Sequence, residues 1–211
     1  MTSFDRVVGR CLDVIVAALL LLLLVPLLVS IAVLVRATSR GPALFRQERL
    51  GLNKKPFTML KFRTMTDRCS DAEHRAYVRL LLASDSPPAD AVTGLYKLAT
   101  DARVTPVGRF LRRTSLDELP QLWNVLRGQM SLVGPRPALG WEVLLYEEHH
   151  HERFAAKPGL TGLWQVSGRS TVSMRDALDL DVAYVRRRNI RLDLKLLAKT
   201  MPVVVFRRGA A

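Results

Sequence analysis

The stretch VIVAALLLLLLVPLLVSIAVLV, residues 14–35, decides the architecture of this 211-residue chain. It contains no charged residue. At about 1.5 Å rise per residue, a helix of this length reaches across the roughly 30 Å hydrocarbon core of a bilayer. The stretch is too long for a cleaved signal peptide, and Arg36 and Arg40 follow it without a small-residue cleavage site. It therefore predicts a membrane helix.

Pro26 leaves two forms of this membrane helix open. A proline removes one backbone donor and kinks a helix, so the segment either spans the bilayer or bends and returns to the same leaflet. Basic residues lie on both sides, at Arg6 and Arg10 before the segment and from Arg36 to Arg63 after it. The positive-inside rule favours both flanks on the cytoplasmic side. Many spanning helices nevertheless tolerate a proline, so the residues alone do not decide between the two forms.

The charge balance predicts an anionic partner. Lys and Arg number 32 against 19 Asp and Glu, for a net charge of +13, yet 49% of the residues are hydrophobic. A basic and apolar chain favours anionic membrane lipids. A nucleic-acid-binding module is the alternative, but the basic residues flank apolar segments and no recognition motif occurs, so we expect no nucleic-acid partner. Cys11 and Cys69 lie in unlike settings, which indicates free thiols in a reducing compartment.

Apolar spacing and turn residues predict the elements of the remaining chain. These are a strand pair within 43–65, a helix at 71–83 with a loop at 84–88, a helix from Pro106, a second helix beginning near Leu116 or Asp117, a helix over 138–154, a turn at 157–159, a helix over 173–188 and an amphipathic apolar segment over 192–206. Pro120 requires the second helix to begin within one turn before it. We expect the last segment to lie on the membrane, with its helical length limited by Pro202. The predicted fold class is α+β, mostly helical.

Adjacent carboxylates at Asp117 and Glu118 form the candidate catalytic site. Arginines at 109–113 precede them, and Arg136 follows between two prolines. Arginines suit phosphate oxygens, and carboxylates suit Mg²⁺, which accompanies phosphates. The structural alternative is an ordinary capping box, Ser115-x-x-Glu118, at the start of a helix.

Three consecutive histidines, at 149–151, suggest a metal site. On a helix, neighbouring side chains point in different directions and do not converge on one ion. We therefore interpret these histidines as a solvated helix face.

Motifs of known type occur in order along nearly the whole chain. They are Phe4-Asp5, Asp13, Pro26 in its apolar segment, Gly41-Pro42, Phe45-Arg46-Gln47, Arg49-Leu50-Gly51, KFRTM at 61–65, TSLDELPQLWNVL at 114–126, MSLVGPRP at 130–137, KPGLTGLWQV at 157–166, Gly168-Arg169, Asp181, Tyr184-Val185 and Asp193-Leu194-Lys195. With these motifs the chain resembles the bacterial sugar transferase family, the monotopic phosphoglycosyl transferases.

The resemblance implies roles for individual residues. Asp117 matches the nucleophile, and Glu118 together with Asp117 matches the Mg²⁺ ligands. Matches to positions that bind substrate phosphates are Arg112, Arg136, Lys61 and Arg63. Pro26 matches the break of a re-entrant membrane helix, although Val25 stands where the family often has serine. The implied organisation is the short form, with a membrane-anchoring helix at 1–40 and a compact cytoplasmic catalytic domain at 41–211 that carries amphipathic interfacial helices.

The implied reaction transfers a sugar 1-phosphate from a UDP-sugar to polyprenyl (undecaprenyl) phosphate, with release of UMP. It takes place at the cytoplasmic face of the bacterial inner membrane and begins a surface polysaccharide such as an exopolysaccharide or a lipopolysaccharide O-antigen. Downstream glycosyltransferases are further expected partners, and the resemblance leaves a homodimer open. A non-catalytic scaffold of the same fold is the remaining alternative, against which the intact Asp117-Glu118 pair argues. The sugar itself is not indicated by any residue.

Overall fold

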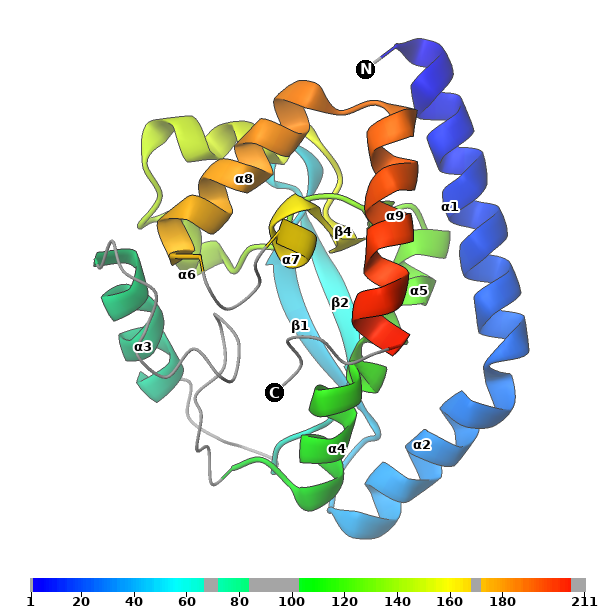
Figure 1. Cartoon of the computed structure of the whole chain (residues 1–211). Helices are drawn as coiled ribbons and strands as arrows, with labels where there is room; N and C mark the ends of the chain where they lie inside the picture. Colours follow the sequence, from blue (N-terminus) through cyan, green and yellow to red (C-terminus); the bar gives the residue numbers. More distant parts are fainter. Residues whose placement is uncertain (1, 67–71, 84–102, 168–171, 206–211) are drawn as a thin grey trace.

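The structure is a computed structural model that describes residues 2–66, 72–83, 103–167 and 172–205. It is mostly helical, as the sequence predicts, and it contains two two-stranded sheets among these residues (Figure 1). The elements are α1 (Ser3–Leu23), α2 (Val25–Thr38), β1 (Leu44–Leu50), η1 (Leu52–Lys54), β2 (Pro56–Phe62), α3 (Ala72–Ala83), α4 (Pro106–Thr114), η3 (Leu116–Glu118), α5 (Gln121–Leu126), β3 (Ser131–Val133), α6 (Gly140–Val143), η4 (Glu148–Ala155), β4 (Gly159–Thr161), α7 (Leu163–Ser167), α8 (Met174–Arg187) and α9 (Ile190–Val205), where η denotes a 3-10 helix.

The N-terminal apolar segment forms two helices, α1 and α2, that are bent by 63° against each other. The break lies at Leu24, and Pro26 falls in the first turn of α2, where its missing N–H needs no partner. No single described helix is long and apolar enough to cross a membrane, whereas this bent pair meets the criteria of length and composition when taken together. The predicted break of the apolar segment near Pro26 is therefore confirmed. It lies at Leu24, two residues before the proline.

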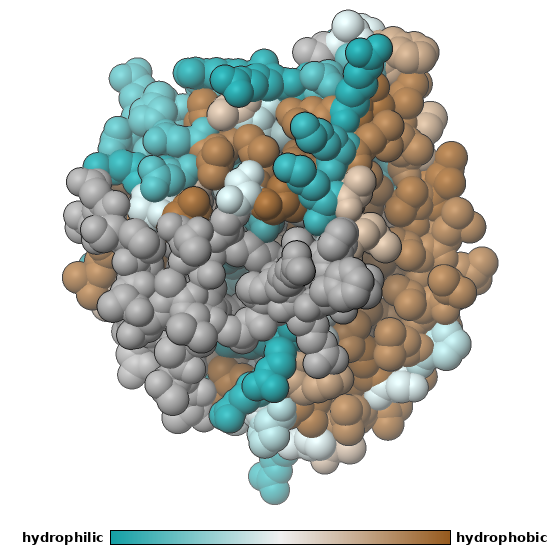
Figure 2. Space-filling view, viewed as in Figure 1, coloured by the Kyte–Doolittle hydropathy of each residue, from teal (hydrophilic) through white to brown (hydrophobic). Residues whose placement is uncertain are grey.

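Hydrophobic side chains cover the outer side of α1 and α2. Figure 2 shows them gathered in brown along one side of the molecule. The exposed members include Ile15, Leu19, Leu22, Leu23, Leu27, Val29, Val33 and Leu34. An apolar surface that is continuous over two helices is typical of a membrane or protein interface.

The inner side of α1 is attached to the rest of the chain by two charged residues. The Arg10 guanidinium donates to the carbonyl oxygens of Val125, at 2.6 Å, and Leu126, at 2.8 Å, which end α5. One turn later, Asp13 Oδ1 accepts the N–H of Leu132 in β3 at 2.8 Å. Charge-assisted bonds of this kind are stronger than neutral ones, so α1 is fixed to α5 and β3 at two points.

Strands β1 and β2 form the predicted antiparallel pair, which is thereby confirmed. Leu44 pairs with Phe62 at one end and Leu50 with Pro56 at the other. The main hydrophobic core lies between this hairpin, α1, α5, β3, α8 and α9. Its buried members are Ala17, Phe57, Met59, Leu122, Val125, Met130, Leu132, Val133, Tyr184 and Leu196.

Asn124 joins α5 to the edge of β2. Its Oδ1 accepts the N–H of Leu60 at 3.1 Å, and its Nδ2 donates to the carbonyl of Thr58 at 2.7 Å and to Gln129 Oε1 at 2.8 Å. The side chain is almost completely buried, so water cannot replace these bonds.

We expect Asn124→Ala to lower the free energy of unfolding by about 2–3 kcal/mol, because it leaves the Leu60 N–H and the Thr58 carbonyl without their partner. Thermal unfolding in detergent checks this as a fall of about 4–10 °C in Tm. Gln129→Ala is the matched control, since it removes one of the three bonds and should have the smaller effect. Equal midpoints for Asn124→Ala and the wild type would show that these bonds do not hold α5 to β2.

The second sheet was not predicted. Strands β3 and β4 pair in parallel, with Ser131 opposite Gly159 and Val133 opposite Thr161. The backbones approach so closely that a Cβ on Gly159 would lie 2.1 Å from the backbone nitrogen of Gly134. The sequence shows only a turn at 157–159, because a three-residue strand carries too little periodicity to be recognised.

The single helix predicted over 138–154 is wrong. The region contains the short α6 and the 3-10 helix η4, separated by extended backbone at Glu147 (φ −70°, ψ 158°). Tertiary contacts override the helical pattern, because His150, Arg153 and Phe154 of η4 are buried.

The C-terminal helices agree with the prediction. Helix α8 begins after Ser173, whose side chain accepts the N–H of Asp176 at 3.0 Å. Helix α9 continues through Pro202 to Val205, further than the proline predicts. Helix α3 is also confirmed, whereas the predicted loop at 84–88 lies outside the described residues.

Candidate active site

Asp117 and Glu118 lie in a separate turn and not at the start of the following helix. Helix α4 ends at Ser115, whose φ of 56° is left-handed, and η3 then carries both carboxylates. The next helix, α5, begins at Gln121. The helical turn predicted from Leu116 or Asp117 is present as the 3-10 helix η3, with both carboxylates in its first turn, but the α-helix itself begins only at Gln121, after Pro120. A left-handed non-glycine residue carries some strain and is enriched at functional sites.

The capping-box alternative is not supported. The Ser115 side chain makes no capping hydrogen bond, and Glu118 Oε1 instead pairs with Lys61 Nζ at 2.7 Å. Both partners of the pair are partly exposed, at 21% for Lys61 and 39% for Glu118. Asp117 is buried beside them. Aspartates are seldom buried without a partner or a function, which makes this turn a candidate site.

Arg112 reaches the same region from α4. Its Nε donates to Thr64 Oγ1 at 2.8 Å, directly beyond the end of β2. This contact depends on a close approach of α4 to the chain at Thr64, because a Cβ on Gly108 would lie 2.0 Å from the Thr64 carbonyl oxygen. Lys61 and Arg112 thus come from two elements that flank the carboxylate turn. Their predicted contact with substrate phosphates remains a prediction.

Arg63 lies at the end of the bent helix pair. Its Nη2 donates to the carbonyl oxygen of Ser39 at 2.8 Å and to Ser39 Oγ at 2.9 Å. Ser39 is the residue that ends α2. Among the described residues, Arg63 Nε and Nη1 have no hydrogen-bond partner. Arg63 therefore fastens the end of α2 to β2, and its predicted role in phosphate binding remains untested.

Arg136 is held through its backbone. Its N–H donates to Asp181 Oδ2 at 3.3 Å, and its carbonyl oxygen accepts from Arg153 Nη2 at 2.7 Å. Arg153 Nη2 also pairs with Asp181 Oδ2 at 2.5 Å. Sequence reasoning missed Arg153, and it included Asp181 only through the resemblance, because the three residues lie far apart along the chain.

The surroundings of this buried pair change its ionisation. Burial raises the pKa of Asp181 to about 6, because the loss of water outweighs the attraction of Arg153 and the bond from the Arg136 N–H. Burial likewise raises the pKa of the neighbouring Tyr146 to about 12. Near pH 7 the Asp181 carboxylate is therefore mostly ionised and pairs with Arg153.

The Asp117–Glu118 pair has the donor chemistry that a divalent cation requires. Two carboxylates supply hard oxygen ligands, and Mg²⁺ is usually bound by one or two carboxylates, with water and substrate phosphate completing the octahedron. The Lys61 ammonium already contacts Glu118, which shows that a positive charge is accommodated at this carboxylate.

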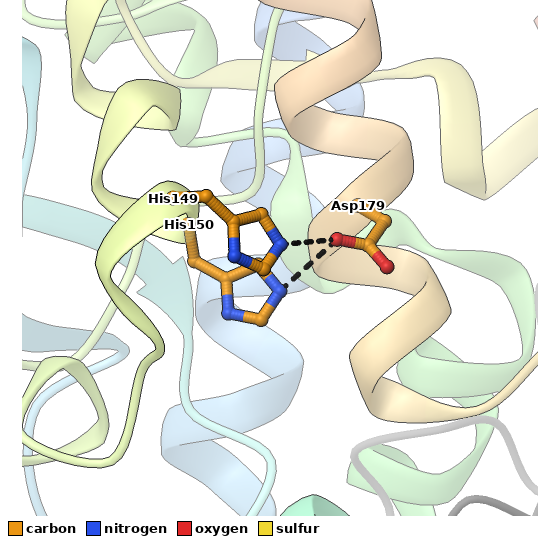
Figure 3. A group of neighbouring side chains, drawn as sticks. All are labelled: His149, His150 and Asp179. Atoms are coloured by element: carbon orange, nitrogen blue, oxygen red, sulfur yellow. Dashed lines mark hydrogen bonds and ion pairs between the residues drawn. The ribbon is translucent and has the colours of Figure 1, made fainter.

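A second group of possible ligands lies between η4 and α8. Figure 3 shows the rings of His149 and His150 converging on Asp179, with Nε2–Oδ1 distances of 2.8 and 3.1 Å. The expected divergence of neighbouring histidines is therefore wrong, since this segment is not an α-helix. The interpretation as a solvated face is also wrong for His150, which is buried.

The ring nitrogens of His150 are used for hydrogen bonds, which argues against a metal ion bound by this group. His150 Nδ1 accepts the N–H of Glu147 at 3.2 Å. Burial lowers the pKa of His150, so the ring is neutral near pH 7. Its proton must then lie on Nε2, which donates to Asp179 and has no lone pair for an ion.

Comparison with known proteins identifies the family of the chain. The family model described as "Bacterial sugar transferase" matches residues 4–207. The exopolysaccharide production protein ExoY of Rhizobium meliloti is 41% identical, over 95% of this chain and 87% of its own length. An undecaprenyl-phosphate galactose phosphotransferase of Salmonella typhimurium and an uncharacterized sugar transferase of Haemophilus influenzae are each 40% identical over 98% of this chain.

The length of the match differs among these relatives. The chain spans 42% of the Salmonella and Haemophilus proteins, but most of ExoY. The matched part of each relative corresponds to nearly the whole of this chain, including the bent helix pair, the carboxylate turn and the proline-flanked arginine. On the family match and on these relatives, this chain belongs to the bacterial sugar transferase family.

Proposed function

We propose that this protein transfers a sugar 1-phosphate from a UDP-sugar to polyprenyl phosphate, with Asp117 as a covalent nucleophile. The observation that carries the proposal is the carboxylate turn, in which buried Asp117 precedes a Glu118 paired with Lys61, while Arg112 approaches from α4. The names of two relatives, a UDP-galactose-lipid carrier transferase and a UDP-glucose:undecaprenyl-phosphate glucose-1-phosphate transferase, support the same donor and acceptor classes.

Asp117 performs the first displacement. A carboxylate oxygen attacks the phosphorus that bears the sugar, the bond from that phosphorus to the bridging oxygen breaks, and UMP leaves with the electron pair. An oxygen of polyprenyl phosphate then attacks the same phosphorus and releases Asp117. The anomeric C–O bond of the sugar stays intact in both steps.

Positive charge makes the attack of one anion on another feasible. Lys61 and Arg112 lie beside the turn, where they neutralise phosphate oxygens as charge builds up in the transition state. Mg²⁺ bound to Asp117 and Glu118 would add charge of the same sign at the diphosphate. Arg136 offers a planar fork whose backbone is already fixed by two prolines and by Arg153 and Asp181.

The bent helix pair brings the carboxylate turn to the lipid acceptor. We propose that α1 and α2 enter and leave the cytoplasmic leaflet of the bacterial inner membrane, so that the turn faces a lipid phosphate at the membrane surface. The exposed apolar side of both helices and the basic residues on both flanks support this placement. The proposed product begins an exopolysaccharide or a related surface glycan.

Release of UMP tests the proposed function directly. Detergent-solubilised protein is incubated with polyprenyl phosphate, Mg²⁺ and a panel of UDP-sugars, and UMP is measured by chromatography. We expect release from at least one sugar nucleotide, dependent on both the lipid and Mg²⁺. Formation of UDP in place of UMP would contradict the proposal, because it would mean that the sugar was transferred without its phosphate.

A further inference from the structure

The backbone of Arg136 is held on both sides by one buried ion pair. Asp181 accepts the Arg136 N–H, and Arg153 donates to the Arg136 carbonyl oxygen. The side chains of Arg153 and Asp181 are each only 2% exposed. Two charges are expensive to bury, so a pair that survives in this position serves a purpose other than stability alone.

We propose that Arg153 and Asp181 are positioning residues that set the direction of the Arg136 side chain toward the donor phosphates. This inference rests on the proposed function, in which Arg136 binds a substrate phosphate. Pro135 and Pro137 fix their own φ angles, and Pro137 also disfavours the helical region for Arg136, but neither proline sets the φ and ψ angles of Arg136 within the extended region. Bonds to both the N–H and the carbonyl of Arg136 restrict those remaining rotations.

The pair reaches Arg136 from two separate elements. Arg153 belongs to η4 and Asp181 to α8, and Arg153 Nη1 is itself held by the hydroxyl of Tyr146 at 2.9 Å. Arg153 also lies over the Tyr146 ring, 5.4 Å from its centre. Aromatic and hydrogen-bond contacts together keep the guanidinium of Arg153 in one orientation.

Other polar contacts join η4 to α8 without touching Arg136. His149 and His150 bond to Asp179, and Glu152 pairs with Arg186 at 2.6 Å. The Glu152–Arg186 pair is exposed and lies on the same interface, one residue before Arg153. Loss of that pair reports on the interface alone, which makes it the matched control.

A double-mutant cycle separates positioning from general damage. We expect Asp181→Asn to lower kcat/KM for the UDP-sugar about 10- to 100-fold, because misplacement of a catalytic group by about 1 Å has effects of this size. In an Arg136→Ala background, where no side chain remains to be directed, Asp181→Asn should cause no further loss. Glu152→Gln should leave kcat/KM unchanged in both the wild-type and the Arg136→Ala backgrounds. An equal loss from Asp181→Asn with and without Arg136 would overturn the proposal, as would no loss in the wild-type background.

Hydrogen–deuterium exchange tests the same proposal without relying on turnover. Peptides that cover residues 131–139 should exchange faster in Asp181→Asn than in the wild type or in Glu152→Gln. Unchanged exchange there would overturn the inference whatever the activity. Faster exchange combined with absence of UMP release from the wild type would contradict the proposed function and leave the positioning of Arg136 standing.

Arg153→Lys covers the case in which Asp181→Asn does not fold. Lysine keeps the charge opposite Asp181 but loses the planar fork that also reaches Tyr146 and the Arg136 carbonyl. We expect an unfolding midpoint near that of the wild type, faster exchange at 131–139 and a loss of kcat/KM that disappears in the Arg136→Ala background. Wild-type exchange and activity in a folded Arg153→Lys protein would overturn the proposal.

Discussion

Asp117→Asn is expected to abolish sugar-phosphate transfer, with a loss of at least a thousandfold in kcat and a normal fold. An amide has almost the shape of the carboxylate but cannot attack phosphorus, so both displacements stop. Asp117 is buried in the η3 turn, and an amide there removes a charge without creating a cavity. The effect should therefore fall on kcat and leave the unfolding midpoint close to that of the wild type.

Intact-mass analysis measures the same event directly. Wild-type protein given a UDP-sugar, but no lipid acceptor, should gain the mass of one sugar phosphate. Asp117→Asn should gain none, and Asp179→Asn, a change at an aspartate in α8 outside the turn, should label like the wild type. Turnover above a few per cent of the wild-type rate in Asp117→Asn would show that the transfer does not pass through this carboxylate.

The topology of α1 and α2 should appear as an all-or-none labelling pattern. Single cysteines are placed at Ser3 and at Ala37, in a protein from which Cys11 and Cys69 have been removed. Ala37 is exposed near the end of α2, whereas the neighbouring Ser39 is unsuitable because it bonds to Arg63. A re-entrant pair places both positions in the cytoplasm, because the basic flanks resist transfer across the membrane. Neither cysteine should react with an impermeant thiol reagent outside intact cells, and both should react once the inner face is opened.

Labelling of the Ser3 position alone from outside would establish a spanning helix and contradict the hairpin. Pro26→Ala provides the matching perturbation. Without the proline, α1 can continue into α2, so we expect part of the population to adopt the spanning form. Arg6 and Arg10 oppose that change, so the shift should remain partial. Pro26→Ala that labels like the parent from both sides would show that Pro26 does not set the bend.

The long periodic elements of the fold were readable in the sequence. The apolar stretch with Pro26, the strand pair, α3, α4 and α8 carry strong patterns or caps, such as Ser173 before α8. The parallel pair of β3 and β4 was not readable, because each strand has three residues and is defined only by its partner. The helix expected over 138–154 failed for the same reason, since the burial of Arg153 and Phe154 decides that backbone.

The site was predictable in its chemistry but not in its connections. Adjacent carboxylates and nearby arginines indicate a phosphate site without any structure. That Lys61 pairs with Glu118, and that Arg63 instead reaches Ser39, depends on contacts between residues far apart in the chain. Left-handed backbone at Ser115 also has no sequence signal, because serine is not the residue that usually adopts it.

The hydrogen bonds of Arg10 and Asp13 that fix α1 to α5 and β3 have a consequence for the proposed encounter with a lipid phosphate. A catalytic domain on a flexible linker would sample many heights above the bilayer. Arg10 on the end of α5 and Asp13 on β3 join the proposed membrane anchor directly to the helix that follows the carboxylate turn and to the second sheet. If α1 and α2 lie in a membrane, the fold itself then determines the distance of Asp117 from the membrane surface. On the proposed function, a lipid phosphate that diffuses in the plane of the membrane would then meet Asp117 at a constant depth, and only the soluble nucleotide would have to approach through three dimensions.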